Sequence, residues 1–120
     1  MNSTDQQPTN TNREELRLEV MRVIEANPEM SQREIARELG ASLGGVNYAM
    51  RALVERGLIK VQNFRKADNK IGYAYLLTPA GMKQKGQLAA AFLSRKLKEY
   101  ELLRQEIEAL KTELSGRAEI

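Results

Sequence analysis

Between residues 31 and 40 the apolar positions repeat with the period of an α-helix. Ser31, followed by Glu34 three residues later, is typical of a capping box at a helix N-terminus. Gly40 follows the last apolar position, where helices often end on a residue in the left-handed conformation. The pattern predicts a short helix that ends in a tight turn. Its apolar face consists of Ile35, Ala36 and Leu39.

A second helical pattern starts directly after that turn. Ser42 is a suitable N-cap, and four apolar residues then recur at helical spacing, which predicts a buried stripe. In helix-turn-helix proteins the second helix presents its other face to DNA bases, so we call this face the recognition face. The buried stripe is Val46, Ala49, Met50 and Leu53, and the recognition face is Ser42, Leu43, Gly44, Gly45, Asn47, Tyr48 and Arg51.

The side chains of the recognition face suit DNA. Arg51 can donate two hydrogen bonds to guanine, Asn47 can pair with the edge of adenine, and Tyr48 can reach a phosphate. Gly44 and Gly45 each weaken a helix by about 1 kcal/mol relative to alanine. They indicate either a close approach to the DNA backbone or a loosely wound start of the helix.

Two β-prone runs follow the helix pair, at residues 58–61 and 73–77, and Gly57 separates the first run from the helix. The turn-forming and cationic residues between the runs predict a two-stranded hairpin with a basic tip, the wing. Such a tip can lie over the minor groove or the flanking phosphates, although a charged loop can also be merely solvated. The candidate DNA-binding residues of the wing are Arg65, Lys66, Asn69 and Lys70.

On these residues the chain resembles the MarR family of bacterial winged-helix regulators. The resemblance rests on the capped helix from Ser42, its exit through Gly57 into the first strand, the Asp-Asn-Lys wing at residues 68–70 and the Leu-Thr-Pro-Ala-Gly segment at residues 77–81; it covers roughly residues 13–85. It implies a homodimer on a palindromic operator, often acting as a repressor. The short length and helical tail are most similar to a small subgroup associated with exopolysaccharide gene clusters.

The resemblance has two further implications. The family's wing usually carries Asp-x-Arg, with the arginine in the minor groove, whereas Lys70 stands at that place here, and arginine suits narrow grooves better than lysine. The family also often binds a small apolar or phenolic effector, which here stays unidentified. Aromatic residues that can line its site, or equally a core or an interface, are Tyr73, Tyr75, Phe92 and Tyr100.

The C-terminal part of the sequence predicts one long helix from Pro79, which suits a first helical position. Apolar residues recur in two series seven residues apart, the pattern of a coiled coil, broken once by Lys96. The alternative is a helix packed on its own domain, but an isolated amphipathic helix leaves its apolar stripe in water. The relative direction of two paired helices stays open. The dimerisation residues are Leu93, Leu97, Tyr100, Leu103, Ile107, Leu110 and Leu114.

Along the chain, these patterns predict a mostly α fold with a small β-hairpin: a winged helix-turn-helix followed by a long C-terminal helix that forms a dimeric coiled coil. Residues 1–12 are expected to be a disordered polar tail, residues 13–78 the DNA-binding domain, residues 79–115 the dimerisation helix, and residues 116–120 a tail. The first helix of the domain, expected after an Asn12 cap, turns inward Leu16, Val20, Val23 and Ile24.

The net charge of +3 is unevenly distributed. Residues 43–85 hold eight Lys or Arg against two acidic residues, a net of +6, whereas residues 86–120 are neutral. The excess cations therefore lie on the recognition helix and the wing, as binding to phosphates requires. The alternative is a protein–protein adaptor of the same fold, whose coil recruits a different partner. Salt-dependent binding to duplex DNA distinguishes the two.

The sequence has no cysteine and no histidine. Disulfides, thiol redox chemistry and the usual zinc sites are thereby excluded. No phosphate-cradling glycine loop and no pair of carboxylates in an apolar setting indicates an enzyme, so we expect neither a cofactor nor a metal. No signal peptide or membrane-spanning run is visible in the sequence, which favours a cytoplasmic protein.

Overall fold

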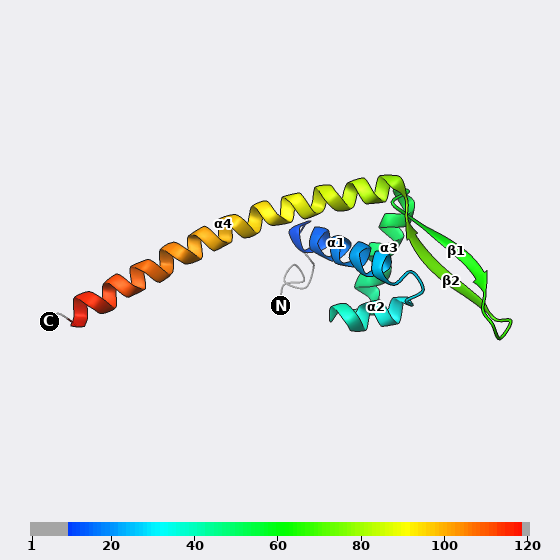
Figure 1. Cartoon of the computed structure of the whole chain (residues 1–120), viewed down its shortest axis with the longest axis horizontal. Helices are drawn as coiled ribbons and strands as arrows, with labels where there is room; N and C mark the ends of the chain where they lie inside the picture. Colours follow the sequence, from blue (N-terminus) through cyan, green and yellow to red (C-terminus); the bar gives the residue numbers. More distant parts are fainter. Residues whose placement is uncertain (1–9, 119–120) are drawn as a thin grey trace, which may run out of the picture. The chain divides into compact units, whose positions relative to one another are not determined.

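The computed structural model of the chain describes residues 10–118. An antiparallel hairpin stands between the third and the fourth helix, which confirms the expected winged helix-turn-helix with a long C-terminal helix (Figure 1). The pairing of that helix in a coiled coil stays a prediction. The elements are α1 (Asn10–Ala26), α2 (Gln32–Leu39), α3 (Leu43–Glu55), β1 (Ile59–Arg65), β2 (Ile71–Leu77) and α4 (Pro79–Ala118).

The outer helices are longer than the sequence pattern predicts. α1 begins at Asn10, so Asn12 lies inside its first turn and does not cap it. α4 continues to Ala118 instead of ending near residue 115. A helix that packing has already stabilised can continue through polar residues. The spacing of apolar residues, on which the prediction rests, gives no indication of such an extension. The rest of the two predicted tails, residues 1–9 and 119–120, lies outside the described residues.

The chain divides into two compact units, the first reaching Leu88 and the second starting at Ala89. The first unit therefore extends beyond the predicted domain end at residue 78. Leu88 is buried, and Lys85 forms an ion pair with Glu25 of α1, so the first turns of α4 belong to the winged domain. None of the helices in the described part of the chain is long and apolar enough to cross a membrane.

The core side of α1 is rotated relative to the prediction. Val20 and Ile24 are buried as expected, but Leu16 and Val23 are only half-buried, and Leu18 and Met21 are fully enclosed instead. The reason is that α1 contacts both α3 and β2. A helix covered from two sides buries a wider arc than the single stripe that sequence spacing reveals.

Both predicted caps of the helix pair are confirmed. Ser31 Oγ accepts from the Glu34 N–H at 3.1 Å, and Glu34 Oε1 accepts from the Ser31 N–H at 3.0 Å. That backbone hydrogen bond lowers the pKa of the Glu34 carboxyl. Ser42 Oγ accepts from the Gly45 N–H at 3.0 Å, and Gly40 ends α2 at a φ of 63°. The predicted stripe of α3 is buried: Val46, Ala49, Met50 and Leu53.

The hairpin is held to the helices at its base. β1 and β2 pair from Ile59 opposite Leu77 to Arg65 opposite Ile71. The Tyr75 N–H donates to the carbonyl oxygen of Pro28 at 2.8 Å, which ties β2 to the connection between α1 and α2. Figure 1 shows the hairpin projecting away from α1, α2 and α3, so that its turn lies at a free tip.

One short junction joins α3, the hairpin and α4, and we call it the hairpin–helix junction (Gly57, Leu58, Thr78 and Gly81). The Thr78 hydroxyl donates to the Gly57 carbonyl at 2.6 Å and accepts from the Gly81 N–H at 3.0 Å, while the Thr78 N–H donates to the Leu58 carbonyl at 3.0 Å. Thr78 therefore caps α4 and closes the base of the hairpin. A Cβ added at Gly81 would lie 1.9 Å from the Leu58 carbonyl oxygen.

We expect Gly81→Ala to destabilise the protein, by about 2 kcal/mol or more, because the new methyl group overlaps backbone that cannot move aside. The control is Gly86→Ala in the same helix, where an added Cβ meets nothing within 4 Å. That change should stabilise by about 0.5–1 kcal/mol, as alanine does in helices. Urea unfolding of both variants tests this. Equal stabilisation by both would contradict the tight junction.

Candidate nucleic-acid interface

The recognition face lies on the side of α3 that the core leaves exposed. Tyr48 and Arg51 are exposed, the Tyr48 side chain by 62%. Leu43 and Gly44 are exposed at the N-terminus of the helix, directly after the Ser42 cap. The outer face of α3 thus presents side chains that can reach a ligand as large as a DNA groove.

The side chain of Asn47 is less available for DNA than the sequence suggests. Its side chain is half-buried, and Nδ2 donates to Oε1 of Gln32 in α2 at 3.1 Å. An amide nitrogen carries two donor hydrogens, so one remains for a base edge. The bond to Gln32 fixes how the Asn47 amide is oriented, and Gln32 therefore joins the candidate site as a residue that positions Asn47.

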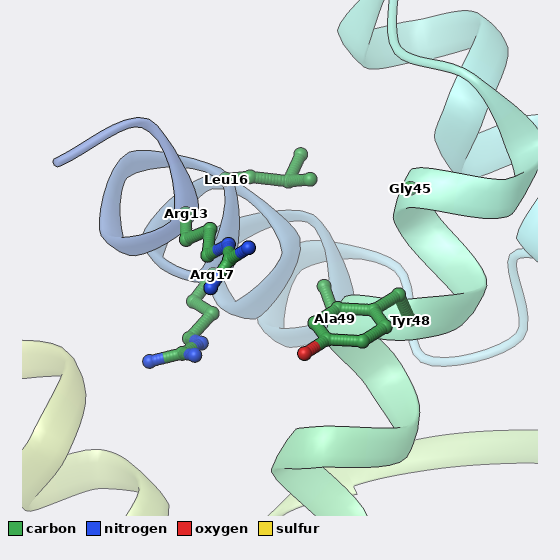
Figure 2. A pocket seen from close by; sticks show the side chains of 6 residues that line it. All are labelled: Arg13, Leu16, Arg17, Gly45, Tyr48 and Ala49. Carbon is green, nitrogen blue, oxygen red and sulfur yellow. The ribbon is translucent and has the colours of Figure 1, made fainter. Parts of the chain in front are cut away.

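The Tyr48 ring, on α3, contacts the N-terminal part of α1. The guanidinium of Arg13 lies over its ring at 6.0 Å from the centroid. A pocket of about 210 Å³ lies at this place. Figure 2 shows Arg13 and Arg17 on one side of it and Tyr48 on the other. Burial, and then the nearby charge of Arg56, lowers the pKa of Arg17. Arg13 and Arg17 extend the positive surface beside the recognition face.

The two glycines at the start of α3 have different surroundings. A Cβ added at Gly45 would lie 3.0 Å from Ser42 Oγ and 3.8 Å from Leu16 in α1. The close approach at Gly45 is therefore to the cap and to α1, within the protein. A Cβ added at Gly44 meets nothing within 4 Å, so the protein itself does not require glycine there.

The tip of the wing is an ordered turn. The Lys66 N–H donates to the Lys70 carbonyl at 2.8 Å, and the Asn69 N–H donates to the Lys66 carbonyl at 2.9 Å. Asn69 has a φ of 68°, the left-handed conformation that closes a three-residue hairpin loop. Its Oδ1 accepts from Arg65 Nη1 at 3.0 Å, and Lys70 lies 4.0 Å from Asp68. Asn69 thus shapes the turn and orients Arg65.

The structure brings most predicted site residues into the first unit, and it adds three that sequence reasoning missed. The recognition face and the wing both belong to that unit. The missed residues are Gln32, Arg13 and Arg17. Arg13 and Arg17 are four residues apart, which places them on one side of a helix. This spacing could have indicated from the sequence that the two cations lie together. Nothing in the sequence pattern pairs Gln32 with Asn47, because the contact joins two different helices.

The predicted dimerisation residues all lie on α4 in the second unit, and each is more than 40% exposed. The aromatic residues considered for an effector are divided: Tyr73 and Tyr75 lie on β2, and Phe92 and Tyr100 lie on α4. Their role in a ligand site stays a prediction. Within residues 10–118 no group of three acidic or other metal-binding side chains is placed to hold a metal ion.

Comparison with known proteins assigns the domain to a class. Residues 13–60 match the family model described as winged helix-turn-helix DNA-binding. In agreement with the fold, residues 13–60 are therefore similar to a winged helix-turn-helix DNA-binding domain. Among curated proteins, none matches the sequence.

Solved structures that are similar to the chain include MarR-family regulators. The transcriptional repressor CouR bound to a 23-mer DNA duplex is 25% identical, with a TM-score of 0.57 over 97% of this chain and 78% of CouR. A Thermoplasma acidophilum protein described as a transcriptional regulator is 20% identical, with a TM-score of 0.59 over 75% of this chain and 92% of its own. Staphylococcus aureus MarR, in complex with salicylate and kanamycin, is 19% identical, with a TM-score of 0.51.

The match to Staphylococcus aureus MarR covers 73% of this chain but only 56% of MarR. The chain thus spans a little over half the length of that regulator. The likeness at these identities is one of fold, and it confirms the resemblance to MarR-family winged helix-turn-helix regulators that the sequence indicated.

Gly44→Ala tests whether DNA approaches the start of α3 closely. The change should stabilise the free protein by about 0.5–1 kcal/mol, because the methyl group enters open space. It should weaken binding to duplex DNA by about tenfold, because the same methyl group then stands against the DNA backbone. Gly86→Ala is the control for helix propensity and should leave DNA binding unchanged. A stabilised Gly44→Ala variant with the parent's DNA affinity would instead indicate a loosely wound helix start.

Proposed function

We propose that the protein is a sequence-specific transcription regulator that binds double-stranded DNA as a homodimer on a palindromic operator and represses the genes it controls. The observation that carries the proposal is the exposed outer face of α3, with Arg51 and Tyr48 accessible and Asn47 oriented by Gln32. Repression is supported by CouR, a repressor with a similar fold.

In this assignment α3 enters the major groove and the wing follows the backbone. Arg51 and Asn47 read base edges, because their donors match guanine and adenine. Arg65, Lys66 and Lys70 mainly neutralise phosphates, since cations on a projecting turn meet the backbone first. Asn69 contributes by holding Arg65 in place. The cation excess of residues 43–85 supports this division.

The homodimer is proposed to form through α4. Its large apolar residues from Leu93 to Leu114 are exposed along the helix, and an apolar stripe of this length calls for a partner. One winged domain makes few base contacts, so two linked domains gain affinity from effective concentration.

The biological setting is proposed on the resemblance alone. Similarity to the exopolysaccharide-associated subgroup favours a role in exopolysaccharide gene control, in the cytoplasm. A small effector is part of the same hypothesis, and Staphylococcus aureus MarR, with salicylate and kanamycin, is a structural relative with small ligands.

DNA binding should depend strongly on salt. A dimer making roughly 6–10 phosphate contacts should lose about three to five decades of affinity between 50 and 200 mM salt. Gel-shift titration of a duplex selected from a random pool measures this. A flat salt response would favour the alternative, a protein–protein adaptor whose coil recruits a different partner.

Arg51→Ala and Lys70→Ala should separate base reading from phosphate binding. The first should cost about 1–3 kcal/mol and relax the preference at one base pair of each half-site. The second should weaken all sequences evenly and reduce the salt slope by about one. Binding to the selected duplex and to single-base variants of it gives both quantities. If Arg51→Ala binds as tightly as the parent, α3 is docked in another way.

Ile107→Asp combined with Leu110→Asp should make the protein monomeric, because two charges per helix would enter the apolar interface. The winged domain should stay folded, while operator affinity falls by about two to four decades. Analytical ultracentrifugation and gel shift test this. Leu102→Asp is the control, since Leu102 is exposed on α4 but outside the series of dimerisation residues. A double variant that stays dimeric would place the interface elsewhere, with α1 as the next candidate.

A further inference from the structure

The second unit is a single unbroken stretch of α4, from Ala89 to the end of the helix. The position of every side chain around its axis therefore follows from its residue number. A seam of apolar residues, each more than 40% exposed, follows one side with the alternating spacing of three and four residues that a two-stranded coiled coil needs. We call it the coil seam: Tyr100, Leu103, Ile107, Leu110 and Leu114.

The two rows of residues that flank the coil seam carry opposite charges. With Tyr100 and Ile107 at the a positions, the g positions 99, 106 and 113 are glutamates, and the e positions 104 and 111 are basic. One heptad earlier, the same two rows hold apolar residues. The g row is Phe92, Glu99, Glu106 and Glu113, and the e row is Leu97, Arg104 and Lys111.

We propose that α4 pairs in parallel with α4 of a second copy of this chain, and that the two flanking rows select both the direction and the partner. In a parallel coil each g residue faces the e residue five positions further along the partner helix. Three contacts follow, each repeated by symmetry: Phe92 with the partner's Leu97, Glu99 with the partner's Arg104, and Glu106 with the partner's Lys111. All three are complementary, one apolar and two ionic.

An antiparallel coil of the same helix has the opposite electrostatics. There g faces g and e faces e, so the glutamates 99, 106 and 113 would face one another, and the cations 104 and 111 would do the same. Like charges across such an interface disfavour the pairing. The charge pattern therefore distinguishes two orientations between which the apolar seam alone does not choose.

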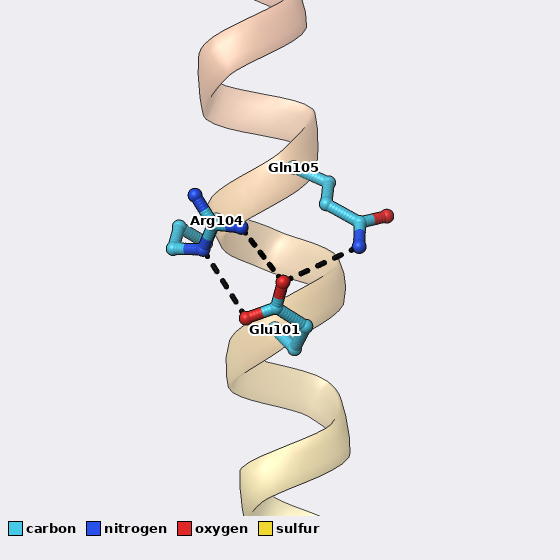
Figure 3. A network of polar contacts seen from close by, with 3 residues as sticks. All are labelled: Glu101, Arg104 and Gln105. Atoms are coloured by element: carbon cyan, nitrogen blue, oxygen red, sulfur yellow. Dashed lines mark hydrogen bonds and ion pairs between the residues drawn. The ribbon is translucent and has the colours of Figure 1, made fainter.

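The second unit is compatible with these contacts as it stands. Arg104 forms two hydrogen bonds with Glu101, one helical turn away (Figure 3). Its Nε donates to Glu101 Oε2 at 3.2 Å, and its Nη2 donates to Glu101 Oε1 at 2.7 Å. This pair raises the pKa of Arg104 and lowers that of Glu101. A guanidinium carries five N–H donors, so Arg104 can hold Glu101 and still donate to Glu99 of the partner subunit. The intrahelical pair thereby orients Arg104 before the partner arrives.

Lys96 explains where the coil seam begins. It occupies the seam position one heptad before Leu103, and a parallel coil would bring two copies of it to the same level. Its ammonium lies 3.1 Å from Glu99 and 5.1 Å from the centroid of the Phe92 ring. Each charge is thus partly balanced on its own helix, and the continuous apolar seam starts at Tyr100.

The parallel direction deepens the proposed function, on which it rests, because it sets both winged domains at one end of the coil. Within a parallel pair the two Ala89 residues lie about 10 Å apart, the usual distance between packed helices. In an antiparallel pair in which Tyr100 packs against Leu110 of the partner subunit, they would lie roughly 48 Å apart along the axis. Neighbouring half-sites are one turn of DNA, about 34–36 Å, apart, which the parallel arrangement can serve.

Single cysteines in this cysteine-free chain test the direction. Leu114→Cys in the full-length protein should give a covalent dimer under mild oxidation, because seam residues of equal number face each other in a parallel coil. Ser115→Cys is the control, next in sequence but off the seam, and should cross-link at least about tenfold more slowly. A mixture of Tyr100→Cys and Leu110→Cys chains, distinguished by mass, should yield like pairs and no mixed pair, whereas an antiparallel coil would pack Tyr100 against Leu110 of the partner subunit.

Charge substitutions give a second readout that needs no cross-link. Glu106→Lys should weaken the dimer by about tenfold, because both copies of its ionic contact become repulsive. Glu108→Lys carries the same change in charge two residues away, off the flanking rows, and should leave the dimer nearly unchanged. In an antiparallel coil Glu106→Lys would have little effect, since one repulsive pair replaces another.

Exclusive Tyr100–Leu110 mixed cross-links, or equal cross-linking at positions 114 and 115, would overturn the parallel seam. Equal effects of Glu106→Lys and Glu108→Lys would overturn the role of the flanking rows. These failures are separable from failure of the proposed function: a dimer that binds the operator with the expected salt dependence but cross-links antiparallel refutes only this inference. A chain that stays monomeric in sedimentation refutes the α4 interface itself.

Discussion

The hydroxyl of Thr78 makes the contact on which the rest of the domain depends. It bonds to the carbonyl of Gly57, just after α3, and to the N–H of Gly81 in the first turn of α4. The end of the recognition helix, both ends of the hairpin and the start of the long helix are thus fixed at one place. The absence of a side chain on Gly81 is what lets α4 approach the Leu58 carbonyl closely enough.

This junction explains why the functional parts can be polar and exposed. The apolar stripe of α3 is buried and its ends are capped, so the stability of the helix does not depend on its outer face. Arg51 and Tyr48 can then be placed for a ligand. In the wing, a turn closed by the left-handed Asn69 holds Arg65 by a side-chain hydrogen bond, so the cations are presented on an ordered loop.

The sequence alone predicted the helix pair, its caps, the hairpin and the long helix, because each leaves a local signal in spacing, cap residues or turn residues. The prediction of which side of α1 is buried was wrong. Contacts with both α3 and β2 decide which of its residues are buried, and the sequence around Leu18 and Met21 does not reveal these contacts. Two further contacts could not be predicted, because each joins residues of different helices. They are the hydrogen bond between Asn47 and Gln32 and the contact of Arg13 with the Tyr48 ring.

The same contrast holds for the glycines. Gly44 and Gly45 look alike in the sequence, but Gly45 faces Ser42 and Leu16 while Gly44 faces open space. Gly81 was noticed only as part of a family-like segment, and its close contact with Leu58 became visible once the hairpin was closed. Local patterns therefore predicted the elements of the candidate site, whereas its positioning contacts required the fold.

The central claim is that two recognition helices, tied together by α4, read one DNA duplex. Hydroxyl-radical footprinting of the full-length protein on its selected operator, with the number of chains per duplex measured in parallel, tests it most directly. The account predicts two chains per duplex and two equal footprints on one side of the DNA, separated by 10–10.5 base pairs or a multiple of that. A single footprint with one chain per duplex would contradict it.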